Sequence, residues 1–327
     1  MVDETMVRHP REAFEIQRAI VGGPDEIDLI LDDLCSANSQ RCKVLQDAIR
    51  DLNDPLIWNY MLKYLAFYCW HENDDSFLQP KTSAKKVVGQ AIIEVFIRDE
   101  WDCESEVKVD VLYKNLDSPQ LKIRYSAAYL LGLRGDPASI PILSRIIDVE
   151  NKTWKLRSVE ALSKINNEDC AVPLMKALII DRGKIHREAR RALRNLGPYA
   201  ESVWSKALNH TDSHIRWEAA HGLSQIGDSR AALTLAEGLL DENYVVRWTT
   251  ANVLAQIGED GVRSVFNILV KNELNETLRQ SALHTLNRIT SPELREKIKP
   301  LMDALLRSSS NELPSSIARG LLMEWED

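Results

Sequence analysis

A pattern that returns at a nearly constant spacing is the strongest constraint on how this chain can fold. Its clearest copy spans residues 214–228. The slot of Arg216 holds a basic residue in all six copies: Arg124, Lys155, His186, Arg216, Arg247 and Arg279. Self-similarity at a fixed period of about 30 residues is typical of solenoids, whose units stack on their neighbours. The 327 residues are therefore predicted to form one repeat array and not two ordinary globular domains.

Three further columns indicate which helix face is buried. Three residues after the basic slot comes a small residue: Ala127, Ser158, Ala189, Ala219, Thr250 and Ala282. Seven residues after it comes leucine: Leu131, Leu162, Leu193, Leu223, Leu254 and Leu286. Ten residues after it come Arg134, Ile165, Leu196, Ile226, Ile257 and Ile289. Offsets 3, 7 and 10 share one face of an α-helix, so we expect this face in the core, with small residues allowing close helix approach.

The slot eleven residues on predicts where each helix ends. It holds mostly glycine: Gly135, Asn166, Gly197, Gly227, Gly258 and Thr290. Glycine supplies the left-handed backbone conformation of a helix C-cap at low cost. Each copy is thus predicted to be the second helix of a helical hairpin.

The stretches 124–136, 214–228 and 246–258 resemble HEAT repeats, and most closely the short type named after phycobilisome lyases. Six copies cover about 116–305. The resemblance implies an all-α, right-handed α-α superhelix whose second helices line a concave surface used to bind partners. It implies little about activity.

The segments outside the clearest repeats divide the chain further. We expect residues 1–83 to form a divergent N-terminal helical cap that ends in a polar loop at 71–83. Residues 84–306 should form the array, and 307–327 a C-terminal capping helix. Outside the repeats, helices are predicted over 11–21, 25–35, 40–51, 56–70, 85–98, 104–116 and 315–325.

Composition limits the function classes. A net charge of −8 and a pI of about 5.5 disfavour wrapping of long duplex nucleic acid, which needs a basic surface. The five cysteines show no C-x-x-C spacing, which indicates buried thiols in a reducing compartment. The N-terminus resembles no signal peptide and no run of 18 apolar residues exists. We therefore expect a cytoplasmic protein without a membrane span.

Four copies hold arginine in the basic slot, namely Arg124, Arg216, Arg247 and Arg279, and we interpret this arginine column as structural. In HEAT repeats such arginines bond to carboxylates and carbonyls in the turns of adjacent repeats. The matching turns of this chain contain an acid: Asp117, Asp148, Asp181, Asp212 and Asp241.

Offsets 1, 5 and 8 point away from the predicted core and define the candidate binding face. The candidates on this face are Tyr125, Tyr129, Arg187, Arg191, Arg194, Trp217, His221 and Trp248. The stretch 180–208 contains seven Lys or Arg residues and three acidic residues, which gives it a local charge of +4. This basic stripe is either an anion site or a solvated charged face. Trp217 and Trp248 share a slot in adjacent repeats and either bind a partner or stack on each other.

A metal or cofactor site is not predicted. His214, Glu218 and His221 share one helical face, and imidazole with carboxylate could hold a metal. Deoxyhypusine hydroxylases are HEAT proteins that bind iron through repeated adjacent His-Glu pairs. The corresponding slots here hold Tyr125-Ser126, Leu156-Arg157, Arg187-Glu188, Trp217-Glu218, Trp248-Thr249 and Gln280-Ser281. None is His-Glu, so that activity does not carry over.

These patterns favour a non-catalytic scaffold that binds a protein partner on the concave face. The partner surface should be acidic or otherwise anionic near Arg187, Arg191 and Arg194, and apolar near Trp217 and Trp248. One alternative is a tetrapyrrole-binding protein like the phycobilin lyases. Another is a HEAT-like DNA glycosylase, against which the net charge argues. Whether the chain catalyses any reaction stays open.

Overall fold

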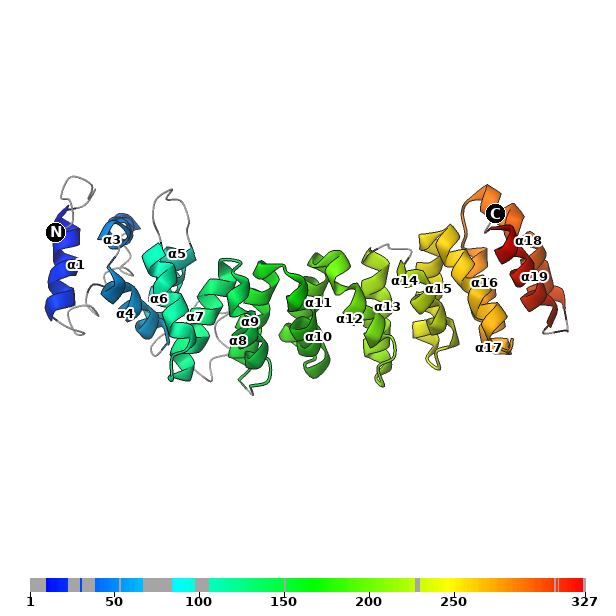
Figure 1. Cartoon of the computed structure of the whole chain (residues 1–327), viewed down its shortest axis with the longest axis horizontal. Coiled ribbons are helices and arrows are strands. Elements are labelled where there is room, and N and C mark those ends of the chain that lie inside the picture. The colour runs from blue at the N-terminus through cyan, green and yellow to red at the C-terminus, as the bar shows by residue number, and fades with distance from the viewer. Residues whose placement is uncertain are drawn as a thin grey trace. The chain divides into compact units, whose positions relative to one another are not determined.

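The computed structural model of this protein is helical wherever regular structure occurs among the residues it describes. Those residues are 10–22, 30, 39–52, 54–66, 84–97, 106–149, 151–226, 230–308, 310 and 312–325. The chain divides into two compact units, Met1–Ala192 and Leu193–Asp327. The predicted all-α class is confirmed for the described part of the chain (Figure 1).

The first unit contains a succession of helices. Its α-helices are α1 (Pro10–Gly22), α3 (Ser39–Leu52), α4 (Pro55–Tyr64), α5 (Ala84–Ile97), α6 (Glu106–Leu116), α7 (Leu121–Leu133), α8 (Ile140–Ile146), α9 (Lys152–Ile165) and α10 (Ala171–Ile180). The boundary between the units falls inside α11 (Lys184–Asn195). Short 3₁₀ helices lead into α8 and α10: Pro137–Ser139 and Glu168–Cys170.

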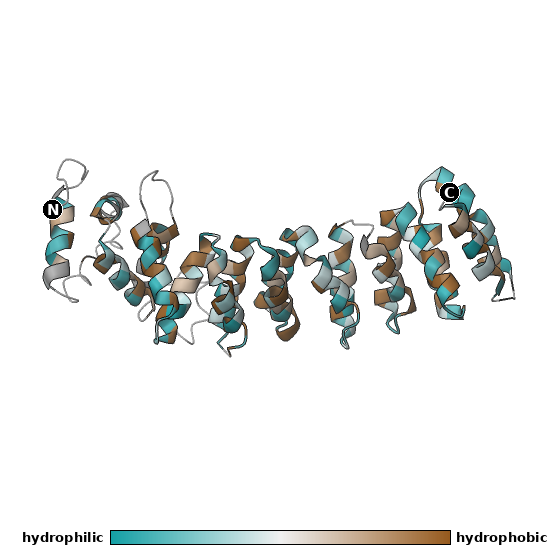
Figure 2. Ribbon diagram, viewed as in Figure 1, coloured by the Kyte–Doolittle hydropathy of each residue, from teal (hydrophilic) through white to brown (hydrophobic). Residues whose placement is uncertain are grey.

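The second unit continues the same alternation. Its α-helices are α12 (Glu201–Ala207), α13 (Ser213–Ile226), α14 (Arg230–Glu237), α15 (Tyr244–Ile257), α16 (Glu259–Lys271), α17 (Glu276–Asn287), α18 (Pro292–Arg307) and α19 (Glu312–Glu324). Its 3₁₀ helices are Gly197–Ala200 and Gly238–Leu240. Brown hydrophobic and teal hydrophilic segments alternate along the helices, as in amphipathic helices that bury one face (Figure 2).

The buried residues confirm two of the three predicted core columns, whereas in the column at offset 10 Arg134, Ile226 and Ile257 are only half-buried. All six leucines of the leucine column have an exposed fraction of 0%, and every member of the small-residue column is buried. At the C-caps, Gly135, Gly197 and Gly258 have φ angles of +83°, +55° and +82°, and Asn166 has +49°. Asparagine is the residue that best replaces glycine in this conformation. Gly227 lies outside the described residues.

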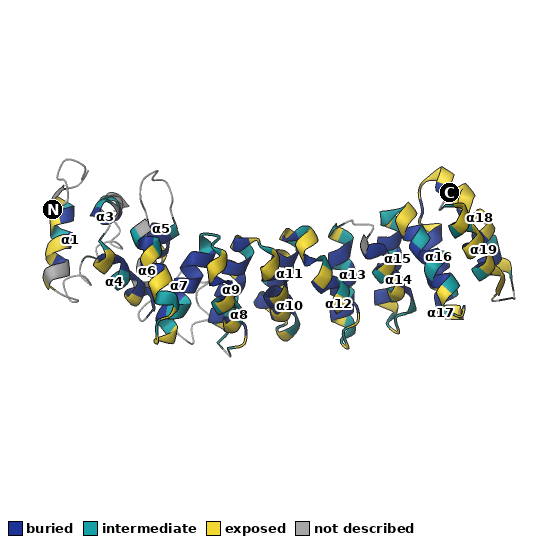
Figure 3. Ribbon diagram, viewed as in Figure 1, coloured by how far each residue is buried: buried dark blue, intermediate teal, exposed yellow. Residues whose placement is uncertain are grey.

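Second helices pack on second helices, and first helices on first helices. In the second unit α15 packs against both α13 and α17, while α14 packs against both α12 and α16. Buried residues, dark blue in Figure 3, therefore lie in both layers of helices. Close approach within a hairpin depends on Gly222, where a Cβ atom would lie 2.4 Å from the ring of Trp204 on α12.

Most predicted helices outside the clear repeats are present within a few residues of their expected ends. The predicted helix 25–35 and polar loop 71–83 fall outside the described residues, as does the end of the predicted helix 56–70. The C-terminal helix begins at Glu312, three residues before its expected start, and packs against α16. Ser315 Oγ donates to Leu269 O at 2.8 Å, and the rings of Phe266 and Trp325 lie 5.1 Å apart. We propose that α19 closes this end of the array.

Two composition-based expectations concern burial and membranes. Cys170 is buried and free, as expected for a structural thiol. The other four cysteine side chains lie outside the described residues. Across the described ranges, no helix combines the length and the apolar character that a membrane span requires.

Candidate functional site

The arginine column links consecutive repeats. Arg216 presents two nitrogen atoms to the carboxylate of Asp241: Nε lies 2.7 Å from Oδ2 and Nη2 lies 2.9 Å from Oδ1. Its Nη1 donates to the carbonyl oxygens of His210 and Thr211, both at 2.9 Å. The Arg216 and Asp241 side chains are only 9% and 8% exposed. This bidentate pair between the fourth and fifth repeats confirms the structural role predicted for the column.

Two other members of the column bind backbone carbonyls, Arg279 near the end of α18 and Arg247 in the turn before α15. Arg279 Nη1 donates to Leu305 O at 2.7 Å. Arg247 Nη1 donates to Asp241 O at 2.7 Å and to Glu242 O at 3.0 Å. Arg216 and Arg247 thus hold the start of their second helices to the preceding turns.

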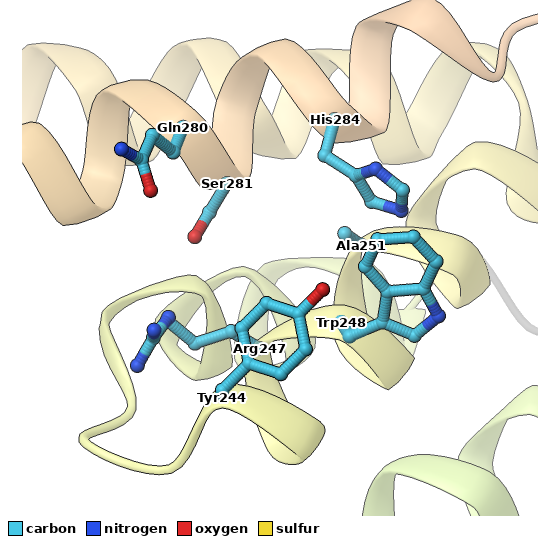
Figure 4. Close-up of a pocket in the computed structure, with 7 residues that line it drawn as sticks. All are labelled: Tyr244, Arg247, Trp248, Ala251, Gln280, Ser281 and His284. Carbon is cyan, nitrogen blue, oxygen red and sulfur yellow. The ribbon is translucent and has the colours of Figure 1, made fainter.

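A pocket of about 220 Å³ lies between α15 and α17, the second helices of the fifth and sixth repeats. Its lining combines exposed aromatic rings with polar groups from both helices (Figure 4): Tyr244, Arg247, Trp248, Ala251, Gln280, Ser281 and His284. Pockets for drug-sized ligands usually measure about 300–1,000 Å³. This pocket therefore suits a single side chain better than a cofactor.

Trp248 forms one wall of the pocket. Its ring is 40% exposed and stacks on His284, with ring centroids 3.8 Å apart. Tyr244, which is 62% exposed, lies next to it with ring centroids 5.9 Å apart. The Arg288 guanidinium lies 6.0 Å from the Trp248 ring. The result is an accessible aromatic surface that the packing of His284 holds in one orientation.

The surroundings of His284 disfavour its protonated form. Burial and the neighbouring Arg288 lower the pKa of His284 below its ordinary value. Its Nε2 lies 3.1 Å from Asn252 Oδ1, which fixes the ring. The positive charge close to the aromatic wall therefore belongs to Arg247 and Arg288.

Trp217 lies in the equivalent slot one repeat earlier and has a different environment. Its ring stacks between two imidazoles of its own helix, with centroids 5.5 Å from His214 and 5.7 Å from His221. The sequence left open whether Trp217 and Trp248 stack on each other. In the structure each tryptophan ring stacks on histidine.

The predicted basic stripe lies on α11. Arg187 and Arg191 are exposed, and Arg194 is half-buried. Within the part of the chain that the structure describes, the side chains of Arg187 and Arg191 form no hydrogen bond or ion pair. Their spacing of four residues places both on one side of the helix.

The expectation that Tyr129 is exposed is wrong. Its side chain is only 5% exposed, and its hydroxyl donates to Glu160 Oε2 at 3.1 Å in the next repeat. Burial raises its pKa. The cause is the close packing of α7 on α9, where a Cβ at Gly132 would lie 2.7 Å from Ala161 Cβ. Tyr125 is half-buried with its ring 5.4 Å from that of Trp154, so neither tyrosine is a freely exposed contact.

Several pocket residues were not predicted from the sequence to be binding residues. Tyr244 precedes the basic slot by three residues, and only offsets 1, 5 and 8 were assigned to the binding face. Arg247 was assigned a purely structural role. One signal could have distinguished it: the turn after Arg247 carries Asn272 at the position where the turn after Arg216 carries Asp241.

Comparison with known protein families agrees with this geometry. A family model described as HEAT repeats matches residues 109–194 and 181–247. The chain carries HEAT repeats. The copies at Arg247 and Arg279 continue the HEAT register in sequence beyond the matched residues. No curated protein matches the chain in sequence.

The solved structures to which the chain is similar are distant from it in sequence. An engineered protein is 17% identical, with coverage of 100% of this chain and 97% of that chain and a TM-score of 0.36. Human deoxyhypusine hydroxylase in complex with glycerol is 16% identical, with coverage of 82% and 98% and a TM-score of 0.27. Kap121p bound to Nup53p is 14% identical, with coverage of 92% and 38% and a TM-score of 0.44. The HEAT assignment therefore rests on the repeats themselves.

Proposed function

We propose that the protein is a non-catalytic scaffold that binds a protein partner on the exposed face of its second helices. The observation that carries this proposal is the state of Arg187 and Arg191. Both are exposed, and neither forms a hydrogen bond or ion pair within the described residues. Arg216, by contrast, uses its guanidinium to join two repeats. Arginines on an exposed helix face that form no hydrogen bond or ion pair within the described residues are well suited to bind the carboxylate of a partner.

The chemistry of the face indicates an acidic partner with apolar side chains. The guanidinium groups of Arg187 and Arg191 favour carboxylates, and the exposed ring of Trp248 favours an apolar contact. A net charge of −8 disfavours nucleic acid as the partner. We also propose a cytoplasmic location, on the cysteine pattern alone.

A tetrapyrrole ligand is less well supported than a protein. The pocket between α15 and α17 is smaller than the usual ligand pocket and suits one side chain. For a DNA glycosylase, the acidic composition remains the main objection.

Selection from a displayed library of random peptides tests the proposal. We expect the wild-type chain to enrich acidic peptides and Arg191→Glu to lose that enrichment. Arg191 is exposed, so the stability of the variant should change by less than about 0.5 kcal/mol. Arg145→Glu, an equal charge reversal at an exposed site on the first helix α8, is the matched control and should enrich the same peptides as wild type. An unchanged peptide pool for Arg191→Glu, or a marked loss of thermal stability, would show that the stripe is structural or idle.

A further inference from the structure

Arg247 and Arg216 occupy the same slot of consecutive repeats but use their guanidinium groups differently. In both, Nη1 donates to two carbonyl oxygens of the turn that precedes its own helix. Arg216 presents its remaining edge, Nε and Nη2, to Asp241 of the next repeat. The corresponding edge of Arg247 has no acceptor among the described residues. Hydrogen bonds through Nη1 therefore hold Arg247 in place, while its Nε and Nη2 remain available as donors.

The turn of the sixth repeat explains the open edge. Asn272 follows Arg247 at the same sequence spacing at which Asp241 follows Arg216. The Asn272 amide donates to Ile268 O at 3.0 Å and supplies no carboxylate. This turn is one residue longer than the preceding one, and Leu274 is buried in it. The only acid of the turn, Glu273, is exposed and forms no ion pair with Arg247.

Arg247 also lines the pocket between α15 and α17. Figure 4 shows its guanidinium beside the ring of Tyr244 and across from Gln280 and Ser281. The guanidinium carbon lies 5.8 Å from the centre of the Tyr244 ring. A cationic group with open donors thus stands next to an exposed aromatic wall.

Two acids near the pocket are engaged with other side chains. Glu276 accepts a hydrogen bond from Gln280 Nε2 at 2.7 Å, and Glu242 lies 3.3 Å from Arg216 Nη2. Arg247 and Arg288 make the pocket unsuitable for a cation. The apolar wall distinguishes it from a site for a simple inorganic anion. Its chemistry fits a carboxylate attached to an apolar group.

We propose that this pocket binds an acidic peptide segment at two points. A carboxylate of the segment takes, against Arg247, the position that Asp241 takes against Arg216. The large apolar side chain of an adjacent residue lies against Tyr244 and Trp248. The inference rests on the proposed function, because it specifies how part of the second-helix face binds a protein. Affinity is favoured because two carbonyls already hold the guanidinium in place.

Fluorescence anisotropy with designed peptides tests this assignment on the wild-type chain. The probes are labelled Gly/Ser octapeptides that carry Leu-Asp, Asp-Leu, Leu-Asn or Gly-Asp at the centre. Peptides with both leucine and aspartate should bind about tenfold more tightly than Leu-Asn, because a carboxylate accepts stronger hydrogen bonds from a guanidinium than an amide oxygen does. Gly-Asp should also bind more weakly. Equal binding of Leu-Asp and Leu-Asn, or no binding by either leucine–aspartate peptide, would overturn the proposal.

Variants of the protein test whether the preference for aspartate over asparagine depends on Arg247. Arg247→Lys keeps the charge but removes the fork, so the preference for Leu-Asp over Leu-Asn should collapse. Glu273→Gln should leave the melting temperature unchanged and should not weaken binding, whereas a loss of stability would identify Glu273 as an internal partner of Arg247. The free carboxylate 4-methylpentanoate should compete poorly, because it lacks the peptide backbone. Competition as strong as that of the peptide would assign the pocket to a small molecule and overturn the peptide assignment.

The failure of this inference can be told apart from failure of the proposed function. Peptides selected on the wild-type chain that depend on Arg191 and ignore Arg247→Lys would leave the scaffold function intact. They would remove only the assignment of the pocket.

Discussion

Replacement of Arg216 with methionine is expected to destabilise the second unit by about 3–5 kcal/mol, the usual cost of removing one partner of a buried ion pair. The variant leaves the Asp241 carboxylate, only 8% exposed, without its bidentate partner. It also removes the donor from the carbonyl oxygens of His210 and Thr211. Urea denaturation followed by circular dichroism measures the loss.

The matched variant is Arg247→Met in the next repeat. It removes hydrogen bonds to two carbonyls but breaks no ion pair, so the loss of stability should be clearly smaller. An equal loss in the two variants would contradict the conclusion that half of the Arg247 fork is open.

Leu223→Ala is expected to cost about 2–5 kcal/mol, because a buried leucine leaves a cavity that its surroundings fill only in part. Leu223 lies on α13 with an exposed fraction of 0%. The control is Leu233→Ala on α14, where the leucine is exposed and the expected change is below about 0.5 kcal/mol. The free energy of unfolding from denaturant titration measures both. A loss for Leu223→Ala as small as that of the control would show that the repeat register is wrong.

The core could be predicted because its physical cause is periodic. Leucines that recur at the repeat spacing must occupy equivalent positions in stacked units, and burial of one implies burial of all. The C-caps followed for the same reason, since glycine or asparagine recurs at the position that needs a positive φ angle.

The exposed face was predicted less well. The offset of a residue in its helix gives the direction of its side chain, but it does not show whether a neighbouring helix covers that side chain. Tyr129 and His221 share offset 5. Tyr129 is nevertheless buried, since α9 packs closely against α7 through Gly132 and Ala161. The pairing of Trp248 with His284 depends on side chains from different offsets of two repeats, which no single column displays.

The candidate pocket depends on an exception to the repeat and not on the repeat itself. The turn between α16 and α17 is one residue longer than the turn before α15, and it carries Asn272 where the repeat would place an aspartate. Only the hydrogen bonds of Arg216 and Arg247 show that this difference opens half of a guanidinium. A pattern search that rewards similarity between copies gives no weight to such a difference.

Site-specific photo-crosslinking tests most directly whether the second helices form the binding surface. A benzophenone amino acid is placed at exposed positions Gln280 and Asn287 of α17, and at exposed Val172 of α10 and Leu233 of α14. Each variant is irradiated with a labelled acidic peptide selected on the wild-type chain. We predict crosslinks from α17 and none from the first helices α10 and α14. Crosslinks from Val172 or Leu233 with none from α17 would contradict a binding face on the second helices.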